Sequence, residues 1–172
     1  IGRTFLPGSN RMAWKFGVQK DGQESAFVVN FGNLAYHGQL DQMIDKMIFY
    51  TGNYAKEEIN FLKCASSYLQ DTAESVHFMD IGANVGVHSL SMSLNVERVV
   101  AFEPSLAAIK RFQRNIEANN ISNVEVQETA LGNAETELSL GRGFDGNPGS
   151  RSLLWGTEDE SQNDIVSVKR GD

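Results

Sequence analysis

Residues 78–86 read F-M-D-I-G-A-N-V-G, and residues 99–104 read V-V-A-F-E-P. In each stretch an apolar run with the length of a strand leads to an acid, Asp80 in the first and Glu103 in the second. The first acid is followed by a turn between two glycines and then by a helical pattern. Because parallel-sheet folds bind ligands at the carboxyl ends of their strands, the two stretches predict an α/β fold with a ligand site at two neighbouring strand ends.

The segments around these stretches extend the pattern. Apolar spacing predicts strands at residues 77–81, 98–102 and 124–127, and helices at residues 87–95 and 105–119. After Ser105 as the N-cap, the inner side of the longer helix is predicted to carry Leu106, Ile109, Phe112, Gln113 and Ile116. An order of strand–helix–strand–helix–strand implies a parallel sheet with right-handed connections.

The chain is predicted to have two parts. Residues 76–172 form the α/β core, and residues 1–75 form an N-terminal extension that packs on it. The extension is predicted to contain a strand at residues 26–31, a possible turn at residues 30–33, and helices at residues 40–50 and 55–69. After residue 132 the spacing changes to the alternation typical of short strands, at residues 136–140 and 165–169, on either side of a long polar surface loop at residues 141–162.

Composition limits the classes of protein to which the chain can belong. The 172 residues are 41% apolar, which fits a folded domain, and no apolar run approaches the roughly 20 residues of a membrane helix. The net charge of −7 argues against nucleic acid and anionic membranes as partners. Cys64 is the single cysteine, so no internal disulfide can form, and a buried thiol in a reducing, cytoplasmic setting is expected.

The residues of the glycine turn distinguish between two nucleotide ligands. A dinucleotide site needs G-x-G-x-x-G, but counting from Gly82 the chain has Asn84 and Val87 where the second and third glycines belong. Asn84 would crowd a pyrophosphate, and Asp80 would repel it. The turn therefore favours S-adenosylmethionine, with methyl transfer as the reaction, over a nucleotide-linked oxidoreductase.

Each part of S-adenosylmethionine has an expected contact. Asp80 faces the amino group of the methionine moiety, and N–H groups after the turn suit its carboxylate. Glu103 accepts hydrogen bonds from both ribose hydroxyls, and the end of the third strand meets the adenine. The predicted cofactor-binding residues are Tyr54, Asp80, Gly82, Ala83, Asn84, Gly86, His88, Ser89, Glu103, Pro104, Glu128, Thr129 and Ala130.

Several motifs resemble the FkbM family of S-adenosylmethionine-dependent methyltransferases. They are D-I-G-A-N-V-G-V-H-S-L at residues 80–90, A-F-E-P at 101–104, N-I-E-A-N-N at 115–120 and T-A-L-G at 129–132. Upstream, Y-T-G-N-Y at residues 50–54 looks like the family's G-x-Y-E element, with Ala55 where the acid is usual. The resemblance covers residues 26–140 and is strongest over residues 76–132.

The resemblance implies a class I, Rossmann-like methyltransferase core. It also implies O-methylation of a hydroxyl on a sugar or another small metabolite. Family members continue into a fourth strand resembling I-K-I-D-V-E-G-A-E, whereas this chain stops at Asp172. We therefore expect a fold that is incomplete at its C-terminus, with an open edge on the first core strand that a second copy of the chain could cover. A non-catalytic module that binds S-adenosylmethionine or S-adenosylhomocysteine is the alternative.

Methylation of a hydroxyl also needs a base. His88 is the candidate, because it follows the glycine turn and lies near the methionine end of the cofactor. His37 is a weaker candidate, and His77 is interpreted as a strand residue whose ring is satisfied within the fold. The three histidines show no metal-ligand spacing, so no metal is predicted. Tyr50 and Tyr54 are placed where they could cover the cofactor or pack between the N-terminal helices.

Overall fold

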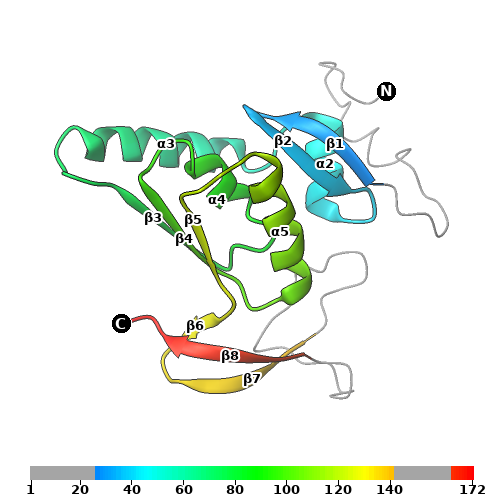
Figure 1. Ribbon diagram of the computed structural model, residues 1–172, viewed down its shortest axis with the longest axis vertical. Helices are drawn as coiled ribbons and strands as arrows, with labels where there is room; N and C mark the ends of the chain where they lie inside the picture. The colour runs from blue at the N-terminus through cyan, green and yellow to red at the C-terminus, as the bar shows by residue number, and fades with distance from the viewer. Residues whose placement is uncertain (1–25, 142–163) are drawn as a thin grey trace. The chain divides into compact units, whose positions relative to one another are not determined.

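Figure 1 shows the computed structural model of the chain, which describes residues 26–141 and 164–172. It divides into two compact units, Ile1–Lys56 and Glu57–Asp172. The proposed domain boundary near residue 75 stays a prediction. Apart from Gly141, the predicted loop at residues 141–162 lies outside the described residues.

The first unit contains a β-hairpin and a helix. The elements are β1 (Ala26–Phe31), β2 (Leu34–Gln39) and α2 (Met43–Thr51). β1 and β2 pair antiparallel through a tight turn in which Gly32 has a φ of 58°, a value that glycine adopts without a steric penalty. The strand β1 and the helix were predicted, whereas β2 was not.

A buried polar contact joins β2 to α2. The Tyr36 hydroxyl donates to Oδ1 of Asp45 over 2.7 Å, and the Gln39 amide donates to Oδ2 over 2.6 Å. Tyr36 and Asp45 are both fully buried, so the carboxylate depends on protein donors in place of water. The hairpin therefore holds the first turn of α2 through a charge-assisted network.

Replacing Tyr36 with phenylalanine is expected to lower the free energy of unfolding of the first unit by about 1.5–3 kcal/mol, the usual range for a hydrogen bond to a charged group. The substitution leaves the ring in place and removes one donor to a buried carboxylate. Denaturant unfolding followed by circular dichroism measures the change. Tyr68→Phe, at an exposed ring, is the control; equal stability of the two variants would contradict the prediction.

The second unit is built on a parallel sheet in the order β3-β4-β5. Its strands are β3 (His77–Ile81), β4 (Arg98–Phe102) and β5 (Val124–Gln127), with helices α3 (Lys56–Gln70), α4 (Val87–Met92) and α5 (Leu106–Ala118). α4 and α5 connect the three strands in a β-α-β-α-β order, as Figure 1 shows. The predicted α/β fold with a Rossmann-like parallel sheet is confirmed, and the three strands have the predicted bounds.

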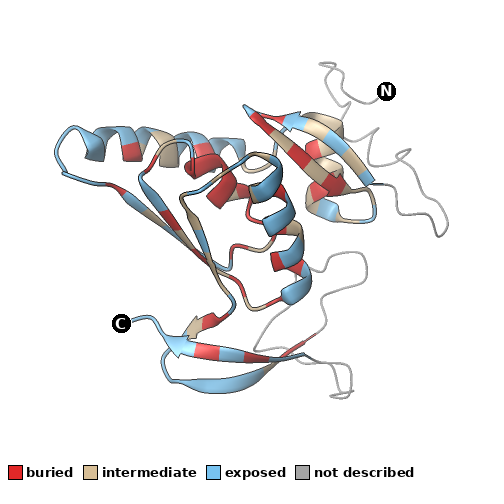
Figure 2. Ribbon diagram, in the orientation of Figure 1, coloured by how far each residue is buried: buried red, intermediate tan, exposed pale blue. Residues whose placement is uncertain are grey.

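One face of this sheet forms the core. Phe78, Val99 and Val124 are neighbours in register, and they pack with Met92 of α4 and Leu62 of α3. Alternation of side chains puts the next residues on the other face, and those on β3 are exposed, as the colouring along β3 in Figure 2 shows. On β3 these include Met79, 58% exposed, and Ile81, 63% exposed. Among the described residues β3 has one strand neighbour, β4, and so lies at an edge of the sheet.

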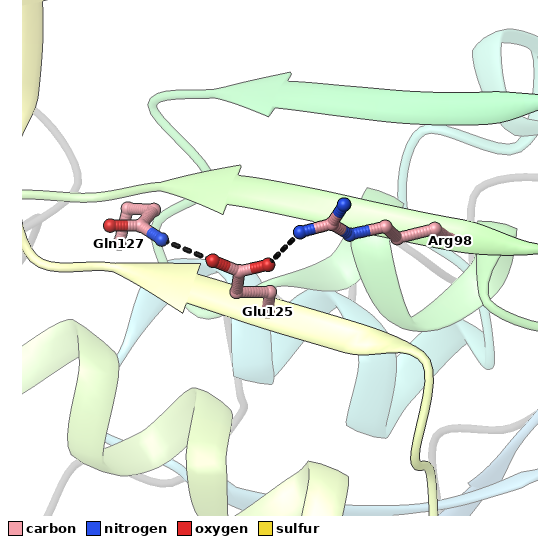
Figure 3. Close-up of polar contacts among 3 residues, drawn as sticks. All are labelled: Arg98, Glu125 and Gln127. Carbon is pink, nitrogen blue, oxygen red and sulfur yellow. Dashed lines mark hydrogen bonds and ion pairs between the residues drawn. The ribbon is translucent and has the colours of Figure 1, made fainter.

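Polar side chains link β4 and β5 on that exposed face. Figure 3 shows Glu125 between Arg98, with which it forms an ion pair, and the amide of Gln127. Hydrogen bonding and charge from Arg98 hold the pKa of Glu125 below its ordinary value. Directly before β3 and β4, the Val76 amide donates to Glu97 over 2.6 Å and lowers the pKa of that carboxyl.

A smaller sheet follows β5, in the order β6-β8-β7. Its strands are β6 (Ala130–Gly132), β7 (Thr136–Leu140) and β8 (Asp164–Arg170). β7 and β8 match the predicted strands closely, but β6 was not predicted. The Thr129 hydroxyl donates to the Ser167 carbonyl over 3.0 Å and so ties the end of the β5 segment to β8.

Some predicted burial is corrected. Cys64 is exposed, so the expected buried thiol was wrong. On α5 the predicted inner residues Ile109 and Phe112 are buried, whereas Leu106, 53% exposed, and Gln113 are exposed and were predicted wrongly. Asn115, which was not predicted, is buried on the same helix. Ser105 is the N-cap as predicted, although its side chain makes no capping hydrogen bond. Within the described ranges no helix has the length and apolar character needed to cross a membrane.

Candidate cofactor-binding site

The register of β3 and β4 brings the two predicted acids to the same edge of the sheet. Asp80 pairs with Ala101 and Ile81 with Phe102, so Glu103, the first residue after β4, lies level with the first residue after β3. The amides of Gly82 and Ala83 both donate to the Phe102 carbonyl, over 2.9 and 3.0 Å. The glycine turn therefore lies against the tip of β4, between the two carboxylates.

The turn needs three residues in the left-handed region of the backbone. They are Gly82 with a φ of 78°, Asn84 with 51° and Gly86 with 75°. Asparagine is one of the few residues other than glycine that visits this region routinely, because its short polar side chain forms local hydrogen bonds. Asn84, which departs from the dinucleotide motif, is thus a residue suited to this turn.

The two glycines meet different surroundings. A Cβ on Gly82 would have no atom within 4 Å, so this backbone is open to an approaching ligand. A Cβ on Gly86 would lie 2.1 Å from two ring carbons of Phe112, which is fully buried on α5. Gly86 therefore allows α4 to begin against the Phe112 ring, and Gly82 is the glycine that faces open space.

Asp80 is held from α4. Its Oδ2 atom accepts a hydrogen bond from the Ser89 hydroxyl over 2.6 Å and another from the Ser89 amide over 3.1 Å. Ser89 is fully buried, whereas Asp80 is half-buried. The carboxylate thus has one oxygen bonded to the helix and remains partly accessible.

Glu103 is held by backbone amides on both sides. Asn84 of the glycine turn donates to Oε2 over 2.8 Å, and Ser105 at the start of α5 donates to Oε1 over 2.8 Å. The side chain is buried, and the two amides bond to different oxygens of the carboxylate. Glu103 therefore links the end of β4 to the glycine turn and to the start of α5.

The other predicted cofactor-binding residues lie partly at this edge of the sheet and partly beyond β5. Ala83 is buried in the turn, His88 is half-buried in the first turn of α4, and Pro104 is half-buried after Glu103. Beyond β5, Glu128 is exposed, Thr129 is bonded to Ser167, and Ala130 pairs with Val168 in the smaller sheet. Tyr54 belongs to the first unit, and its place at the site stays a prediction.

Two contributions to the site were not anticipated. Phe112 was predicted as a core residue, not as the ring against which Gly86 must fit. The amide of Ser105 was likewise not expected to bind Glu103. The sequence did contain a signal for this contact, because Glu103 comes two residues before Ser105, the predicted N-cap. The first amides of a helix have no partner within the helix, so an acid just before the N-cap can accept a hydrogen bond from them.

The chemistry of this edge fits S-adenosylmethionine. An accessible carboxylate at Asp80 suits an ammonium group, Glu103 suits hydroxyl donors, and the open backbone at Gly82 gives room for a ligand between them. The same two acids would repel a pyrophosphate. The structure thus supports the choice of ligand made from the turn residues.

The known proteins to which this chain is similar include methyltransferases. A curated protein of Beauveria bassiana, "Methyltransferase 1", is 30% identical over 108 residues, which are 58% of this chain and 43% of that protein. A solved "SAM Dependent Methyltransferase" from Agrobacterium tumefaciens is 15% identical, with a TM-score of 0.49 over 64% of this chain and 34% of that one. The chain spans less than half the length of the curated relative that it matches. No protein-family model matches it.

One prediction is corrected by these comparisons. Nucleic acid was excluded as a partner because the chain is acidic, but a solved tRNA (uracil-54, C5)-methyltransferase of Pyrococcus abyssi, in complex with S-adenosyl-L-homocysteine, is among the similar structures. It is 15% identical, with a TM-score of 0.44 over 64% of this chain and 28% of that chain. The exclusion was wrong because a net charge averages over the whole surface and does not describe a local binding face.

The predicted cofactor agrees with these relatives, one of which is named as S-adenosylmethionine-dependent and another of which holds S-adenosylhomocysteine. In sequence the chain is similar to a protein named as a methyltransferase, and its parallel β3-β4-β5 sheet carries a glycine turn between two acids.

Proposed function

We propose that the chain forms the S-adenosylmethionine-binding part of a methyltransferase like those of the FkbM family, which methylates a hydroxyl on a sugar or another small metabolite. The observation that carries the proposal is the pair of carboxylates at neighbouring strand ends with the glycine turn between them. Asp80 is bonded to α4, and Glu103 is bonded to the turn itself through the Asn84 amide. The motifs at residues 80–90 and 101–104 support the family assignment.

The proposed contacts follow the order of groups along the cofactor. Asp80 binds the amino group of the methionine moiety, Gly82 gives it space, and Glu103 accepts hydrogen bonds from the ribose hydroxyls. Ala83 and Pro104 flank these contacts in sequence, and Glu128, Thr129 and Ala130 are proposed near the adenine. These assignments put the charged and polar groups of the ligand opposite side chains of complementary character.

The bound cofactor supplies an electrophilic methyl group on a sulfonium. The chain must then align an acceptor with the breaking bond and remove its proton. We assign proton removal to His88, which is half-buried one residue before Ser89, the partner of Asp80. An imidazole nitrogen has a lone pair that can accept the proton of a hydroxyl group.

Calorimetry with S-adenosylhomocysteine and with NAD tests the proposed ligand. We expect saturable heat with S-adenosylhomocysteine and none with NAD, because Asp80 and Glu103 attract the donors of the first ligand and repel the pyrophosphate of the second. Competition by 5′-methylthioadenosine, which lacks the amino-acid end, shows whether the nucleoside occupies the same site. Binding of NAD alone, or of neither ligand, would overturn the assignment.

The methyl acceptor requires a separate experiment. Labelled S-adenosylmethionine is incubated with the protein and with glycans, small hydroxylated compounds or tRNA, the last because of the tRNA methyltransferase among the similar structures. Label on a glycan or small hydroxyl supports the proposal, and label on tRNA alone replaces the acceptor class. Binding without transfer to any acceptor favours the non-catalytic module.

We also propose a reducing location such as the cytoplasm. The single cysteine, Cys64, is exposed on α3 and has no partner in the chain with which to form a disulfide. An exposed thiol of this kind persists where the surroundings keep it reduced. Fractionation of cells that express the tagged protein tests this proposal.

A further inference from the structure

The contact between Ser89 and Asp80 uses two donors on one carboxylate oxygen. The hydroxyl lies 2.6 Å from Oδ2 and the amide of the same residue lies 3.1 Å from it. The terminal torsion of an aspartate is broad and roughly two-fold, so a single contact leaves the plane of the carboxylate poorly defined. Two donors at one oxygen fix that plane and hence the direction of the other oxygen, Oδ1.

Ser89 is itself rigidly placed. It is fully buried, and it is the third residue of α4, whose first turn is closed by the bond from the Leu90 amide to the Gly86 carbonyl over 2.8 Å. Gly86 in turn lies against the Phe112 ring. The position of the Ser89 hydroxyl is therefore set by the packing of α4 and α5 and not by the ligand.

Asp80 has the opposite character. It is half-buried, and within the described ranges no hydrogen bond to Oδ1 is recorded. One oxygen is thus fixed from inside the fold, and the other is available to a donor that arrives from outside. This division suits a carboxylate that binds a cationic group of a ligand better than one that only caps a helix.

We propose that Ser89 is a positioning residue, which holds Oδ2 of Asp80 so that Oδ1 meets the ammonium group of the bound cofactor. The inference rests on the proposed function and gives Ser89, which the sequence predicted as a cofactor-binding residue, a role that acts through Asp80 without needing to touch the ligand. A helix-capping role alone would affect every ligand of the site alike. A positioning role affects only ligands that carry the ammonium group.

The test compares two ligands in calorimetry. S-adenosylhomocysteine has the amino-acid end, and 5′-methylthioadenosine has the same nucleoside without it. Ser89→Ala is expected to weaken binding of S-adenosylhomocysteine about tenfold, the loss expected from one impaired charge-assisted hydrogen bond, and to change binding of 5′-methylthioadenosine less than about twofold. In an Asp80→Asn background the Ser89→Ala change should cause no further loss, because the two residues act as a unit.

Ser93→Ala is the matched control. Ser93 is also a buried serine beside α4, and its hydroxyl donates to the Leu90 carbonyl over 2.8 Å and not to Asp80. This variant should bind both ligands as the wild type does. If Ser89→Ala fails to fold, Ser89→Cys keeps a similar side-chain size with a much weaker donor and should show the same preference for the ligand without the ammonium group.

The outcomes separate the two proposals. If the wild type binds neither ligand, the proposed function fails before any variant is made, and the positioning role fails with it. If the wild type binds S-adenosylhomocysteine but Ser89→Ala weakens both ligands equally, or neither, the positioning role is overturned and the proposed function stands. Selective loss of S-adenosylhomocysteine binding, absent in Ser93→Ala, supports both.

Discussion

Replacing Gly86 with alanine is expected to destabilise the second unit by about 2–5 kcal/mol, the sum of a left-handed backbone penalty and an overpacked core. Gly86 has a φ of 75°, which a residue with a Cβ adopts at a cost. The new Cβ would also lie 2.1 Å from two carbons of the Phe112 ring. Because Phe112 is fully buried, the ring cannot move aside without disturbing α5 and the sheet beneath it.

Denaturant unfolding followed by circular dichroism measures this loss, and a variant on the same turn isolates its cause. Gly82 has a similar φ of 78°, but a Cβ there would meet nothing within 4 Å. Gly82→Ala should therefore show only the backbone penalty, about 1–2 kcal/mol. Replacing the Phe112 ring with the smaller leucine side chain (Phe112→Leu) should make Gly86→Ala less destabilising than it is in the wild type. Equal losses for the two glycine variants would show that the Phe112 contact is unimportant.

Replacing Glu103 with alanine is expected to raise the dissociation constant for S-adenosylhomocysteine by a factor that corresponds to about 2–4 kcal/mol, the loss of two charge-assisted hydrogen bonds to the ribose. The effect should be larger than that of removing a surface acid, because Glu103 also accepts the Asn84 and Ser105 amides. Without it the glycine turn loses its bond to the tip of β4. Binding of 5′-methylthioadenosine should fall as well, since that ligand keeps the ribose.

Glu97→Ala is the control for this prediction. Glu97 also accepts a backbone amide, from Val76 over 2.6 Å, but this contact lies at the amino ends of the strands, away from the turn. The control should leave ligand affinity unchanged. A Glu103→Ala protein that binds S-adenosylhomocysteine as tightly as the wild type would remove Glu103 from the site.

The different roles of Asp80 and Glu103 make the ligand comparison informative. Changes at Ser89 or Asp80 should affect only the ligand with the amino-acid end, whereas changes at Glu103 should affect both ligands. The two acids lie at the ends of neighbouring strands, so a general collapse of the site would not produce this contrast. Measuring both variants with both ligands therefore assigns each end of the cofactor to one strand.

The local pattern was sufficient for the elements that carry the site. β3, β4 and β5 have the bounds predicted from their apolar runs, and α5 follows from its helical spacing. Each is a continuous segment whose hydrophobic period reports its own structure. The acids and the glycine turn are likewise adjacent in sequence to the strands that position them.

The sequence by itself determined the β3-α4-β4-α5-β5 order, the turn and the two acids, because each depends on residues within a few positions of one another. Only the tertiary structure decided which donors those acids use, and that Gly86 must fit a ring 26 positions later in the chain. It also decided the three-residue strand β6, which pairs with β8 far along the chain, and the burial of Asp45 against Tyr36. Such contacts join segments that are distant in sequence, and no local period records them.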